Sequence, residues 1–488
     1  MRRSVVSRMT LYRTLQPAVI QFKVLTRPLP TIGLLLLSDF LALLLAGWLS
    51  VEMRLFFDGQ FTRELYGALW PVLCVFIVAY GIVGLYPGVA ISPVEELRRT
   101  SLTTTLIYLA LGSAIFLFRE GEAYSRAIFL MAWLLSIALV LVGRFGLRSV
   151  FARCRWWGYP VVVLGAGKTG EMVIRMLQRQ PAIGLKPVAV LDDDPQKHGS
   201  LAGVPVIGGL SLAPMLVREQ QVPYAIAAMP GVPRERLLKL LSLHGQTFPH
   251  MLVIPDLFGI ASLWVAARDL GGILGLEIRQ QLLLPGPRLL KALLDYGLTL
   301  VLGILSLPLI GLIAIAVKLD SPGPIFYGHT RIGQNGKVFK AWKFRSMVKD
   351  SSWVLEQYLS SHPDAKALWL RDQKLQRDPR TTRVGALLRR TSLDELPQLW
   401  NVLCRQMSLV GPRPIINDEI WRYDDKFELY LQVLPGVTGL WQVSGRNRIP
   451  YEERVNLDAY YVRNWSVWLD IYILIRTFWV VITGYGAY

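Results

Sequence analysis

The chain has 488 residues, of which 52% are apolar and 18% are charged, and its mean hydropathy is +0.38. This composition excludes an ordinary soluble enzyme and is typical of a membrane protein. Because domains usually contain about 100–200 residues, two or three structural units are expected. The net charge of +18 indicates anionic partners such as lipid head groups or phosphates. The three widely spaced cysteines predict neither a disulfide framework nor a thiolate metal site.

Four nearly uncharged stretches predict four membrane spans, 28–50, 65–94, 100–118 and 127–143. A helix rises about 1.5 Å per residue, so about 20 apolar residues are enough to cross the hydrocarbon core of a bilayer. Asp39 interrupts the first stretch, and we interpret it as a helix-packing or near-interface residue rather than a functional one. Basic residues gather before the first span, between the second and third, and after the fourth. This distribution predicts a cytoplasmic N-terminus, and an even number of spans returns the chain to the cytoplasm.

A fifth apolar stretch, 296–317, contains Ser306 and Pro308. Pro308 removes one helical hydrogen bond, and the Ser306 hydroxyl is able to bond a carbonyl that is left free. Basic residues flank both ends of the stretch, so we predict a broken, re-entrant helix that enters one leaflet and returns. The alternative is a kinked helix that crosses the whole membrane and would export everything after it.

Residues 158–284 alternate between short apolar runs and helical patterns, which predicts a Rossmann-like α/β domain with a doubly wound parallel sheet. Three glycines have the spacing of a dinucleotide-binding turn, and an acidic residue follows the second predicted strand, where it would bind a ribose. These candidate nucleotide-binding residues are Gly165, Gly167, Gly170 and Asp192. Alternatively, the glycines merely permit a tight strand-to-helix turn in a domain without a ligand. The absence of a Tyr-x-x-x-Lys pair from 158–284 weakens a dehydratase or epimerase interpretation.

The C-terminal part carries the densest charged pattern. Five arginines lead directly into an acidic pair: Arg377, Arg380, Arg383, Arg389 and Arg390, then Asp394 and Glu395. Arginine forks suit phosphate groups, and a carboxylate among arginines stays ionised, as a nucleophile or an Mg²⁺ ligand must. A structural alternative is a capping box of Ser392 and Glu395 at a helix N-terminus, where a phosphate would also be favoured. Upstream, Lys343 and Arg345 alternate with aromatic residues, which beside a membrane helix indicates lipid head groups or a phosphorylated substrate.

Three segments, 331–347, 378–414 and 435–447, resemble the signature of the monotopic phosphoglycosyl transferases, also called bacterial sugar transferases. With the parts that precede them, the chain is similar to the large members of this family that begin O-antigen, capsule or exopolysaccharide synthesis. The resemblance implies transfer of a hexose 1-phosphate from a UDP-sugar to undecaprenyl phosphate through a phosphoryl-Asp intermediate, with release of UMP. Galactose is the expected hexose, and glucose is the alternative. The family often has an adjacent Ser-Pro pair at the membrane-helix break, whereas Leu307 intervenes here, which leaves the kink residue open.

The resemblance also implies roles for individual residues. Asp394 is expected to be the nucleophile and an Mg²⁺ ligand, and Glu395 is the other member of the catalytic pair. Asp458 matches a further acidic position without an assigned role. The predicted phosphate-binding residues are Lys343, Arg345, Arg380, Arg383, Arg389, Arg390, Arg413 and Arg446.

We therefore expect a four-span transmembrane domain at 1–157, a Rossmann-like domain at 158–284 and a mixed α/β transferase domain with the re-entrant helix at 285–488. Expected partners are UDP-hexose, undecaprenyl phosphate, Mg²⁺ and lipids of the bacterial inner membrane, with a homodimer as a further expectation and no nucleic acid. The transferase domain is expected on the cytoplasmic side. Two other functions stay open at this point: a membrane-bound nucleotide-sugar oxidoreductase or epimerase, and a non-enzymatic regulator of polysaccharide export that senses a nucleotide.

Overall fold

A computed structural model describes residues 28–57, 66–67, 69–118, 124–233, 235, 247–255, 265–269, 271, 274–278, 281–362, 364, 378–446 and 449–483. The chain forms two compact units, Met1–Phe258 and Gly259–Tyr488. The first unit contains the predicted membrane spans together with the predicted sheet, and the division into three domains stays a prediction. The basic residues before the first predicted span, and Arg377, lie outside the described residues.

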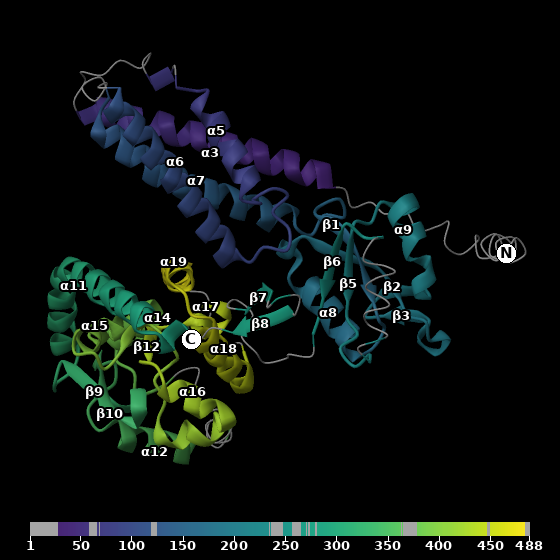
Figure 1. Ribbon diagram of the computed structural model, residues 1–488. Helices are drawn as coiled ribbons and strands as arrows, with labels where there is room; N and C mark the ends of the chain where they lie inside the picture. The colour runs from purple at the N-terminus through teal and green to yellow at the C-terminus, as the bar shows by residue number, and fades with distance from the viewer. Residues whose placement is uncertain are drawn as a thin grey trace, which may run out of the picture. The chain divides into compact units, whose positions relative to one another are not determined.

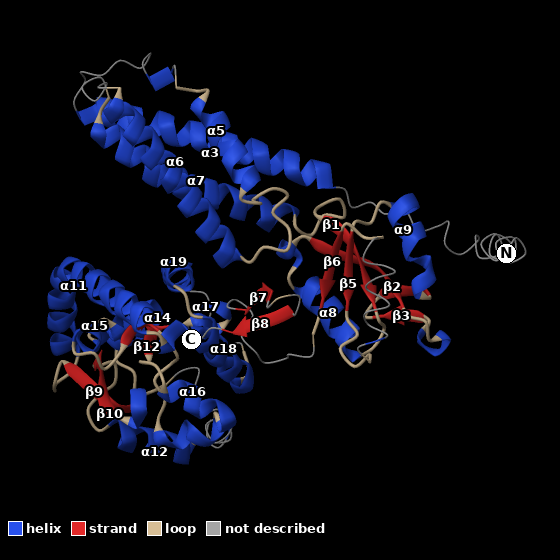
Figure 2. Cartoon of the chain, viewed as in Figure 1, coloured by secondary structure: helices blue, strands red, loops and turns tan. Residues whose placement is uncertain are grey.

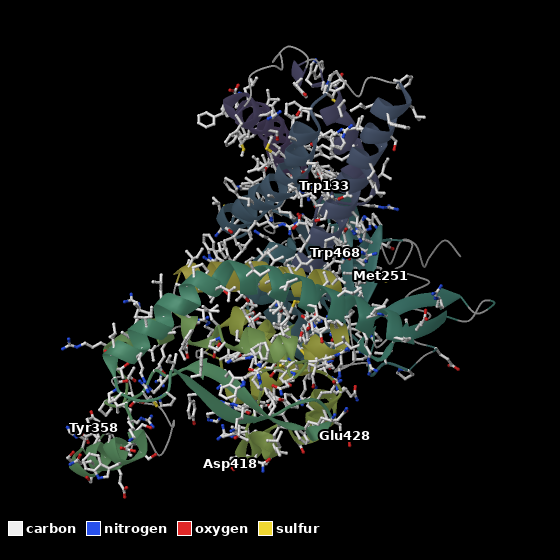
Figure 3. The ribbon with its side chains drawn as sticks, turned by 90° about the vertical axis from the view of Figure 1, so that its left-hand side faces the viewer. Trp133, Met251, Tyr358, Asp418, Glu428 and Trp468 are labelled. Carbon is white, nitrogen blue, oxygen red and sulfur yellow. The ribbon has the colours of Figure 1, made fainter. Side chains whose placement is uncertain are left out.

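Four apolar helices begin the described chain: α3 (Pro28–Phe57), α5 (Val72–Ile82), α6 (Pro93–Leu117) and α7 (Arg126–Phe151) (Figure 1, Figure 2). Helices α3, α6 and α7 are long and apolar enough to cross a membrane. Helix α6 starts where the Ser92 hydroxyl accepts a hydrogen bond from the Glu95 N–H, with Pro93 in the first turn. Trp133, labelled in Figure 3, joins α7 to α6 because its Nε1 donates to Thr105 Oγ1 at 3.0 Å.

The second predicted span, 65–94, is wrong in extent. Helix α5 has only 11 residues, which corresponds to about 16 Å of helix, whereas the hydrocarbon core is about 30 Å thick. The second crossing, on which the predicted even number of spans depends, therefore stays a prediction. Gly84 and Gly88 follow α5 with φ of 74° and 70°, a left-handed conformation that ends helices. Pro87 lies between them and cannot continue a helical hydrogen-bond pattern. Residues 83–92 therefore form a loop that joins α5 to α6.

Four buried charges connect this loop to three helices. Arg144 of α7 pairs with Asp39 of α3 through Nη2 at 2.5 Å and with Glu96 of α6 through Nη1 at 3.0 Å. Arg148 of α7 pairs with the same Glu96 at 2.6 Å. Both arginines also donate to backbone carbonyls of the 83–92 loop. Asp39 is thus a helix-packing residue, in agreement with its interpretation from the sequence, and its charge is compensated inside the protein.

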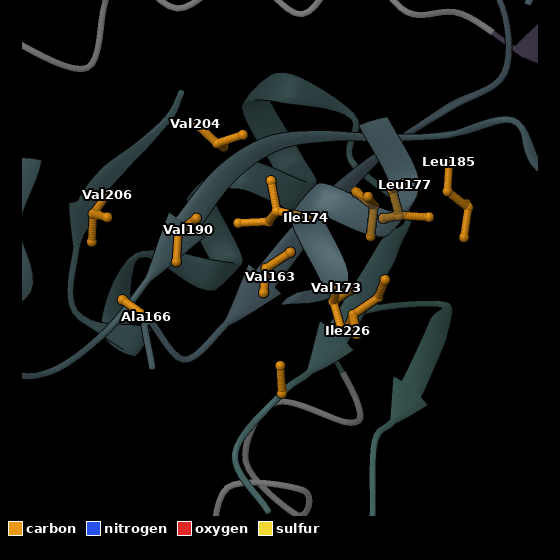
Figure 4. Packing of buried hydrophobic residues seen from close by; sticks show 12 residues of the cluster. Val163, Ala166, Val173, Ile174, Leu177, Leu185, Val190, Val204, Val206 and Ile226 are labelled. Carbon is orange, nitrogen blue, oxygen red and sulfur yellow. The ribbon is translucent and has the colours of Figure 1, made fainter. Parts of the chain in front are cut away.

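The sheet of the first unit has six strands: β1 (Tyr159–Leu164), β2 (Leu185–Leu191), β3 (Gly199–Leu201), β4 (Val204–Gly208), β5 (Tyr224–Ala227) and β6 (His250–Val253). Their order is β3-β4-β2-β1-β5-β6, and every neighbouring pair is parallel except β3 with β4. Helices α8 (Lys168–Arg179) and α9 (Ala213–Gln220) cover opposite faces. Figure 4 shows one face, where Ile174 and Leu177 of α8 pack in the same cluster as Val163 of β1. The predicted doubly wound sheet is present, and the closer likeness to a Rossmann fold stays a prediction.

The second unit mixes helices with short strand pairs, as predicted for the C-terminal part. Strands β7 and β8 and strands β9 and β10 pair antiparallel, whereas β11 and β12 pair parallel. The elements are β7 (Val265–Asp269), β8 (Leu274–Ile278), α11 (Pro285–Asp320), β9 (Phe326–Ile332), β10 (Val338–Phe344), α12 (Ser351–Ser361), α14 (Arg383–Thr391), α15 (Gln398–Leu403), β11 (Ser408–Val410), α16 (Phe427–Leu431), β12 (Gly436–Thr438), α17 (Leu440–Ser444), α18 (Tyr451–Asn464) and α19 (Val467–Thr483).

Helix α11 is attached to its unit by polar side chains in its first half. The Asp295 carboxylate accepts from Ser408 Oγ at 2.8 Å and from the Leu409 N–H at 3.1 Å, both in β11. Lys291 pairs with Asp470 of α19 at 2.8 Å. These contacts hold one end of a 36-residue, largely exposed apolar helix against the rest of the unit.

The break predicted in the middle of α11 is not present: the helix continues without interruption from Pro285 to Asp320 through Ser306 and Pro308, and it is long and apolar enough to cross a membrane. Pro308 has no N–H to offer the preceding turn, and the helix is bent in Figure 1. The Ser306 hydroxyl donates to the Gly303 carbonyl at 3.0 Å, whereas the carbonyl that Pro308 leaves without its helical donor is that of Ile304, four residues earlier. The helix is longer than the predicted 296–317, because its polar ends at 285–295 and 318–320 continue the helical hydrogen bonding.

Candidate active site

Asp394 and Glu395 lie in a single 3-10 turn, η6 (Leu393–Glu395), between α14 and α15. Helix α14 ends because Ser392 adopts a left-handed conformation with φ of 58°. The Ser392 side chain makes no capping hydrogen bond to η6, so the predicted capping box of Ser392 and Glu395 is wrong. The acidic pair is therefore positioned by the change of chain direction after α14, and it does not lie in the first turn of a long helix.

Lys343 reaches the acidic pair from β10. Its Nζ donates to Glu395 Oε1 at 2.5 Å and lies 3.9 Å from Asp394 Oδ2. Side chains alternate between the two faces of a strand, and the register places Arg331 of β9 opposite Phe339, which shares a face with Lys343. The hairpin therefore presents the side chains of Arg331 and Lys343 on one face.

The two carboxyl groups of the pair titrate differently. Burial raises the pKa of Asp394 to about 6; the positive charge of Lys343 opposes this increase, and the negative charge of Glu395 adds to it. Glu395 has a side chain that is 37% exposed. Burial also acts to raise its pKa, but Lys343 and two nearby arginines outweigh that effect and lower it. A group with a pKa of about 6 is mostly ionised at neutral pH, so both carboxylates are available as a nucleophile or as metal ligands.

Arg413 and Arg446 are the two predicted phosphate-binding arginines that lie near Glu395. Burial lowers the pKa of both guanidiniums, and the negative charge of Glu395 opposes that decrease in each. The Cζ of Arg413 lies 5.4 Å from the centroid of the Trp441 ring. Arg446 Nη2 donates to Ser392 Oγ at 3.4 Å, next to the turn that carries the acidic pair. These two side chains and Lys343 give the pair a positive surrounding that suits phosphate oxygens.

The arginines of α14 point in different directions. Arg389 is half-buried and donates to Ser346 Oγ at 2.9 Å, and its charge lowers the pKa of Asp394. Arg383 and Arg390 are exposed to solvent. Phosphate binding by these three arginines stays a prediction.

Two further predicted phosphate ligands are held by the protein itself. Arg345 is buried, and its Nη2 donates to the Ser321 carbonyl at 2.5 Å and to Ser321 Oγ at 2.9 Å, directly after α11. Arg380 makes a two-point ion pair with Asp378, with distances of 2.8 and 2.6 Å. Both guanidiniums thus bond the protein's own groups, although Arg345 Nε and Nη1 have no hydrogen-bond partner among the described residues. Phosphate binding by Arg345 and Arg380 stays a prediction.

Asp458 lies on α18, far from Asp394 and Glu395 in the sequence, and its side chain is buried. The Tyr423 hydroxyl donates to Asp458 Oδ2 at 2.7 Å, and Oδ1 has no hydrogen-bond partner among the described residues. Burial raises the pKa of Asp458 to about 7, whereas the Tyr423 hydrogen bond and the charges of Arg454 and Arg413 oppose that increase. Asp458 thus belongs to the surroundings of Arg413.

Sequence reasoning missed a group of charged residues around Arg413. Arg331 Nη1 and Arg454 Nη2 lie 3.8 and 3.9 Å from the two carboxylate oxygens of Glu419. The Cζ of Arg454 lies 4.7 Å from the Trp441 ring centroid, so Trp441 contacts two guanidiniums. The alternation of the β9–β10 hairpin could have indicated Arg331. Arg454 follows two glutamates on α18, and nothing in the sequence around it distinguishes it from an arginine on the surface of a helix.

The acidic pair fits Mg²⁺ that arrives with a substrate. Among the described residues, no group of three or more His, Cys, Asp or Glu side chains is arranged to hold a metal ion. Mg²⁺ is usually bound by one or two carboxylates together with substrate phosphates. Asp394 and Glu395 supply two such carboxylates, and the donor set therefore fits a shared site with a phosphorylated substrate rather than a metal site made of protein alone.

The predicted nucleotide-binding turn lies at the carboxyl edge of the sheet, where Gly165, Gly167 and Asp192 line a cavity of about 520 Å³. Gly165 has φ of 106°, and a Cβ on Gly170 would lie 2.1 Å from the Gly165 carbonyl oxygen, so the turn itself requires both glycines. Asp192 accepts from the Ala166 N–H at 2.8 Å and thereby fastens the same turn. Only Gly167 of the three glycines faces open space. These contacts favour the structural interpretation of the motif, and nucleotide binding stays a prediction.

Comparison with known proteins identifies the family. Residues 286–484 match the family described as bacterial sugar transferase, and residues 82–255 match one described as CoA-binding domain. The chain is 38% identical over 400 residues to the UDP-galactose-lipid carrier transferase of Erwinia amylovora, which covers 81% of this chain and 82% of the relative. It is 36% identical over 390 residues to the undecaprenyl-phosphate galactose phosphotransferase of Salmonella typhimurium, a match that covers 79% of this chain and 81% of the relative. It is 34% identical over 375 residues to the UDP-glucose:undecaprenyl-phosphate glucose-1-phosphate transferase of Escherichia coli, a match that covers 74% of this chain and 77% of the relative. The predicted resemblance is confirmed: the chain belongs to the bacterial sugar transferase family and is an enzyme.

Proposed function

We propose that the protein transfers hexose 1-phosphate from a UDP-hexose to undecaprenyl phosphate, with Asp394 as the nucleophile and UMP as the released product. The observation that carries this proposal is the buried Asp394 carboxyl group beside Glu395, Lys343 and two arginines. Membership of the bacterial sugar transferase family supports the reaction class, and it removes support from an oxidoreductase, an epimerase or a non-enzymatic regulator. The reaction would be the first step of O-antigen, capsule or exopolysaccharide synthesis.

In the first step, a carboxylate oxygen of Asp394 attacks the β-phosphorus of the UDP-hexose. The bond from this phosphorus to the oxygen that bridges to the α-phosphate breaks, and that oxygen leaves with the electron pair as part of UMP. Asp394 then carries the hexose 1-phosphate as an acyl phosphate. Lys343, Arg413 and Arg446 would neutralise the negative charge that develops on the phosphoryl oxygens.

In the second step, a phosphate oxygen of undecaprenyl phosphate attacks the same phosphorus. The Asp394 oxygen leaves as a carboxylate, so the enzyme returns to its first state and the product is undecaprenyl diphosphate hexose. Asp394 and Glu395 would hold Mg²⁺, which when bound neutralises further charge on the phosphates. Glu395 also keeps the Lys343 ammonium beside the reacting carboxylate through its 2.5 Å hydrogen bond.

Galactose is the proposed hexose, because two relatives named for galactose match at 38% and 36% identity, whereas two relatives named for glucose match at 34% and 31%. Membranes that contain the protein are expected to form labelled lipid and free UMP from radiolabelled UDP-galactose, undecaprenyl phosphate and Mg²⁺. UDP-glucose is expected to give at least about tenfold less product, and EDTA is expected to stop the reaction. Equal labelling from UDP-glucose would exclude galactose specificity, and no labelled lipid from either donor would reject the transferase proposal.

We also propose that α11 is a re-entrant helix and that the catalytic unit lies on the cytoplasmic face of the bacterial inner membrane. The bend of α11, the proline inside it and the basic residues Lys291 and Lys318 on the two sides of that proline support an entry and a return on the same side. Helix α19 exposes large apolar side chains, including Phe478 and Trp479, which would sit at the head-group level. The homodimer stays a prediction.

Cysteine labelling in intact cells tests this topology. In a chain without its native cysteines, Lys318→Cys is expected to resist a membrane-impermeant maleimide added outside and to react in inverted vesicles. Glu120→Cys, between α6 and α7, is the control that should react from outside. Labelling of Lys318→Cys from outside would mean that α11 crosses the whole membrane.

A further inference from the structure

Three arginine side chains gather around one carboxylate beside the acidic pair. Arg331, Arg413 and Arg454, here called the guanidinium cluster, surround Glu419, whose carboxylate is 3.8 Å from Arg331 and 3.9 Å from Arg454. Burial lowers the pKa of Arg413, the positive charge of Arg454 lowers it further, and Glu419 and Glu395 oppose the decrease. Asp458, the other acid near the cluster, has a pKa of about 7 and is only partly ionised at neutral pH. The positive charge of the three arginines therefore exceeds the negative charge of the carboxylates near them.

The same cluster contains buried donors that lack acceptors. Arg454 is 8% exposed, and its Nε and Nη2 have no hydrogen-bond partner among the described residues. Within the same described set, Trp441 Nε1 and the Tyr451 hydroxyl are also buried without partners, and the Arg454 guanidinium lies over both rings. Buried donors are normally paired, and an unpaired buried guanidinium is costly. An anionic ligand with several acceptor oxygens would satisfy both the charge and the donors.

The chemistry of the two steps defines where such an anion must bind. Displacement at phosphorus places the attacking and leaving oxygens roughly in line. UMP therefore leaves on the side of the phosphorus opposite Asp394. The acceptor phosphate displaces Asp394 in the second step, so it must attack from the side that UMP has vacated. A single phosphate subsite can serve both partners in turn.

We propose that the guanidinium cluster is this shared subsite, which binds the α-phosphate of the nucleotide donor in the first step and the phosphate of the lipid acceptor in the second. The inference rests on the proposed function and adds residues and an order of occupancy to it. Arg413 connects the two places, because the charges of both Glu395 and Glu419 act on it. Arg454 is assigned to the phosphate in this subsite, because within the guanidinium cluster it is the arginine whose buried Nε and Nη2 have no hydrogen-bond partner among the described residues.

Arg454→Met tests the assignment, since methionine keeps much of the apolar stem over Trp441 and removes the charge. The KM for UDP-hexose, the KM for undecaprenyl phosphate and the inhibition constant of UMP are each expected to rise about ten- to hundredfold and in similar proportion. Arg454→Lys is expected to recover part of each loss. UMP is expected to inhibit wild type in competition with undecaprenyl phosphate. Arg422→Met is the matched control, because Arg422 also lies over the Tyr451 ring but is exposed, and its constants should stay within about twofold.

Glu419→Gln is a second variant, and it is expected to change the affinity for UMP in the opposite direction to Arg454→Met. It keeps an oxygen that can accept from the Ile416 N–H and removes the one carboxylate at the centre of the cluster, so UMP is expected to bind more tightly. Titration calorimetry of UMP with the full-length protein in detergent needs no turnover and therefore separates this inference from the proposed function. An unchanged UMP affinity in Arg454→Met, a rise confined to only one of the two KM values, or weaker UMP binding in Glu419→Gln would overturn the shared subsite.

Discussion

Replacing Asp394 with asparagine is expected to lower the rate of hexose 1-phosphate transfer by about 10³-fold or more. The amide cannot form the acyl phosphate, whereas Lys343, Arg413 and Arg446 remain able to bind the donor. Asparagine has nearly the shape of aspartate, and the substitution removes a charge that burial disfavours and that Glu395 repels. The variant is therefore expected to fold, and its thermal unfolding should lie close to that of the wild type.

A single-turnover experiment without lipid acceptor measures the covalent step directly. The wild type is expected to release one UMP per enzyme and to gain the mass of a hexose phosphate, and Asp394→Asn should do neither. Asp418→Asn is the matched control, because Asp418 is an exposed aspartate of the same unit (labelled in Figure 3) and should keep full activity. Release of UMP by Asp394→Asn would contradict the assignment. Release by the wild type only when acceptor is present would replace the covalent intermediate with a direct displacement.

Apolar composition predicted which segments belong to the membrane part better than it predicted where their helices begin and end. The stretches that became α3, α6 and α7 contain few residues that end a helix, so length and apolarity were enough. The stretch 65–94 was equally apolar, but Gly84 and Pro87 prevent α5 from continuing beyond Ile82. The partners of Asp39 could not be read from the sequence, because Arg144 lies 105 residues away and meets it only when α3 and α7 pack.

The acidic pair was predictable, whereas its surroundings were only partly so. Successive residues on a helix point about 100° apart, which is why Arg389 contacts Ser346 while Arg390 is exposed, although both belong to one arginine-rich run. The match of Ser392 to a capping box failed because this serine ends α14 instead of starting a helix. Arg454 reaches the site from α18, and only the tertiary fold brings it beside Arg413.

Replacing Arg144 with methionine is expected to destabilise the first unit by about 3–5 kcal/mol, because it leaves a buried carboxylate without its partner. Arg144 and Asp39 are both fully buried and are joined at 2.5 Å. Arg144 also pairs with Glu96 and donates to the Leu85 carbonyl of the 83–92 loop. The same loop donates from the Ala90 N–H to the carbonyl of Ile183, which lies in the 3-10 turn just before β2, so release of the loop should also loosen the attachment of the sheet to the helices.

Chemical or thermal unfolding of the full-length protein in detergent measures the loss. Arg98→Met is the matched control, because Arg98 is half-exposed in its ion pair with Glu95 and such pairs contribute about 0–1 kcal/mol. Adding Asp39→Asn to Arg144→Met removes the charge that the single substitution leaves unpaired, and the double variant is expected to be more stable than Arg144→Met alone. If Arg144→Met cost no more than Arg98→Met, the buried charges would not be what holds the loop and the helices together. A double variant no more stable than the single one would mean that Arg144 acts mainly through Glu96 and the loop carbonyl rather than through Asp39.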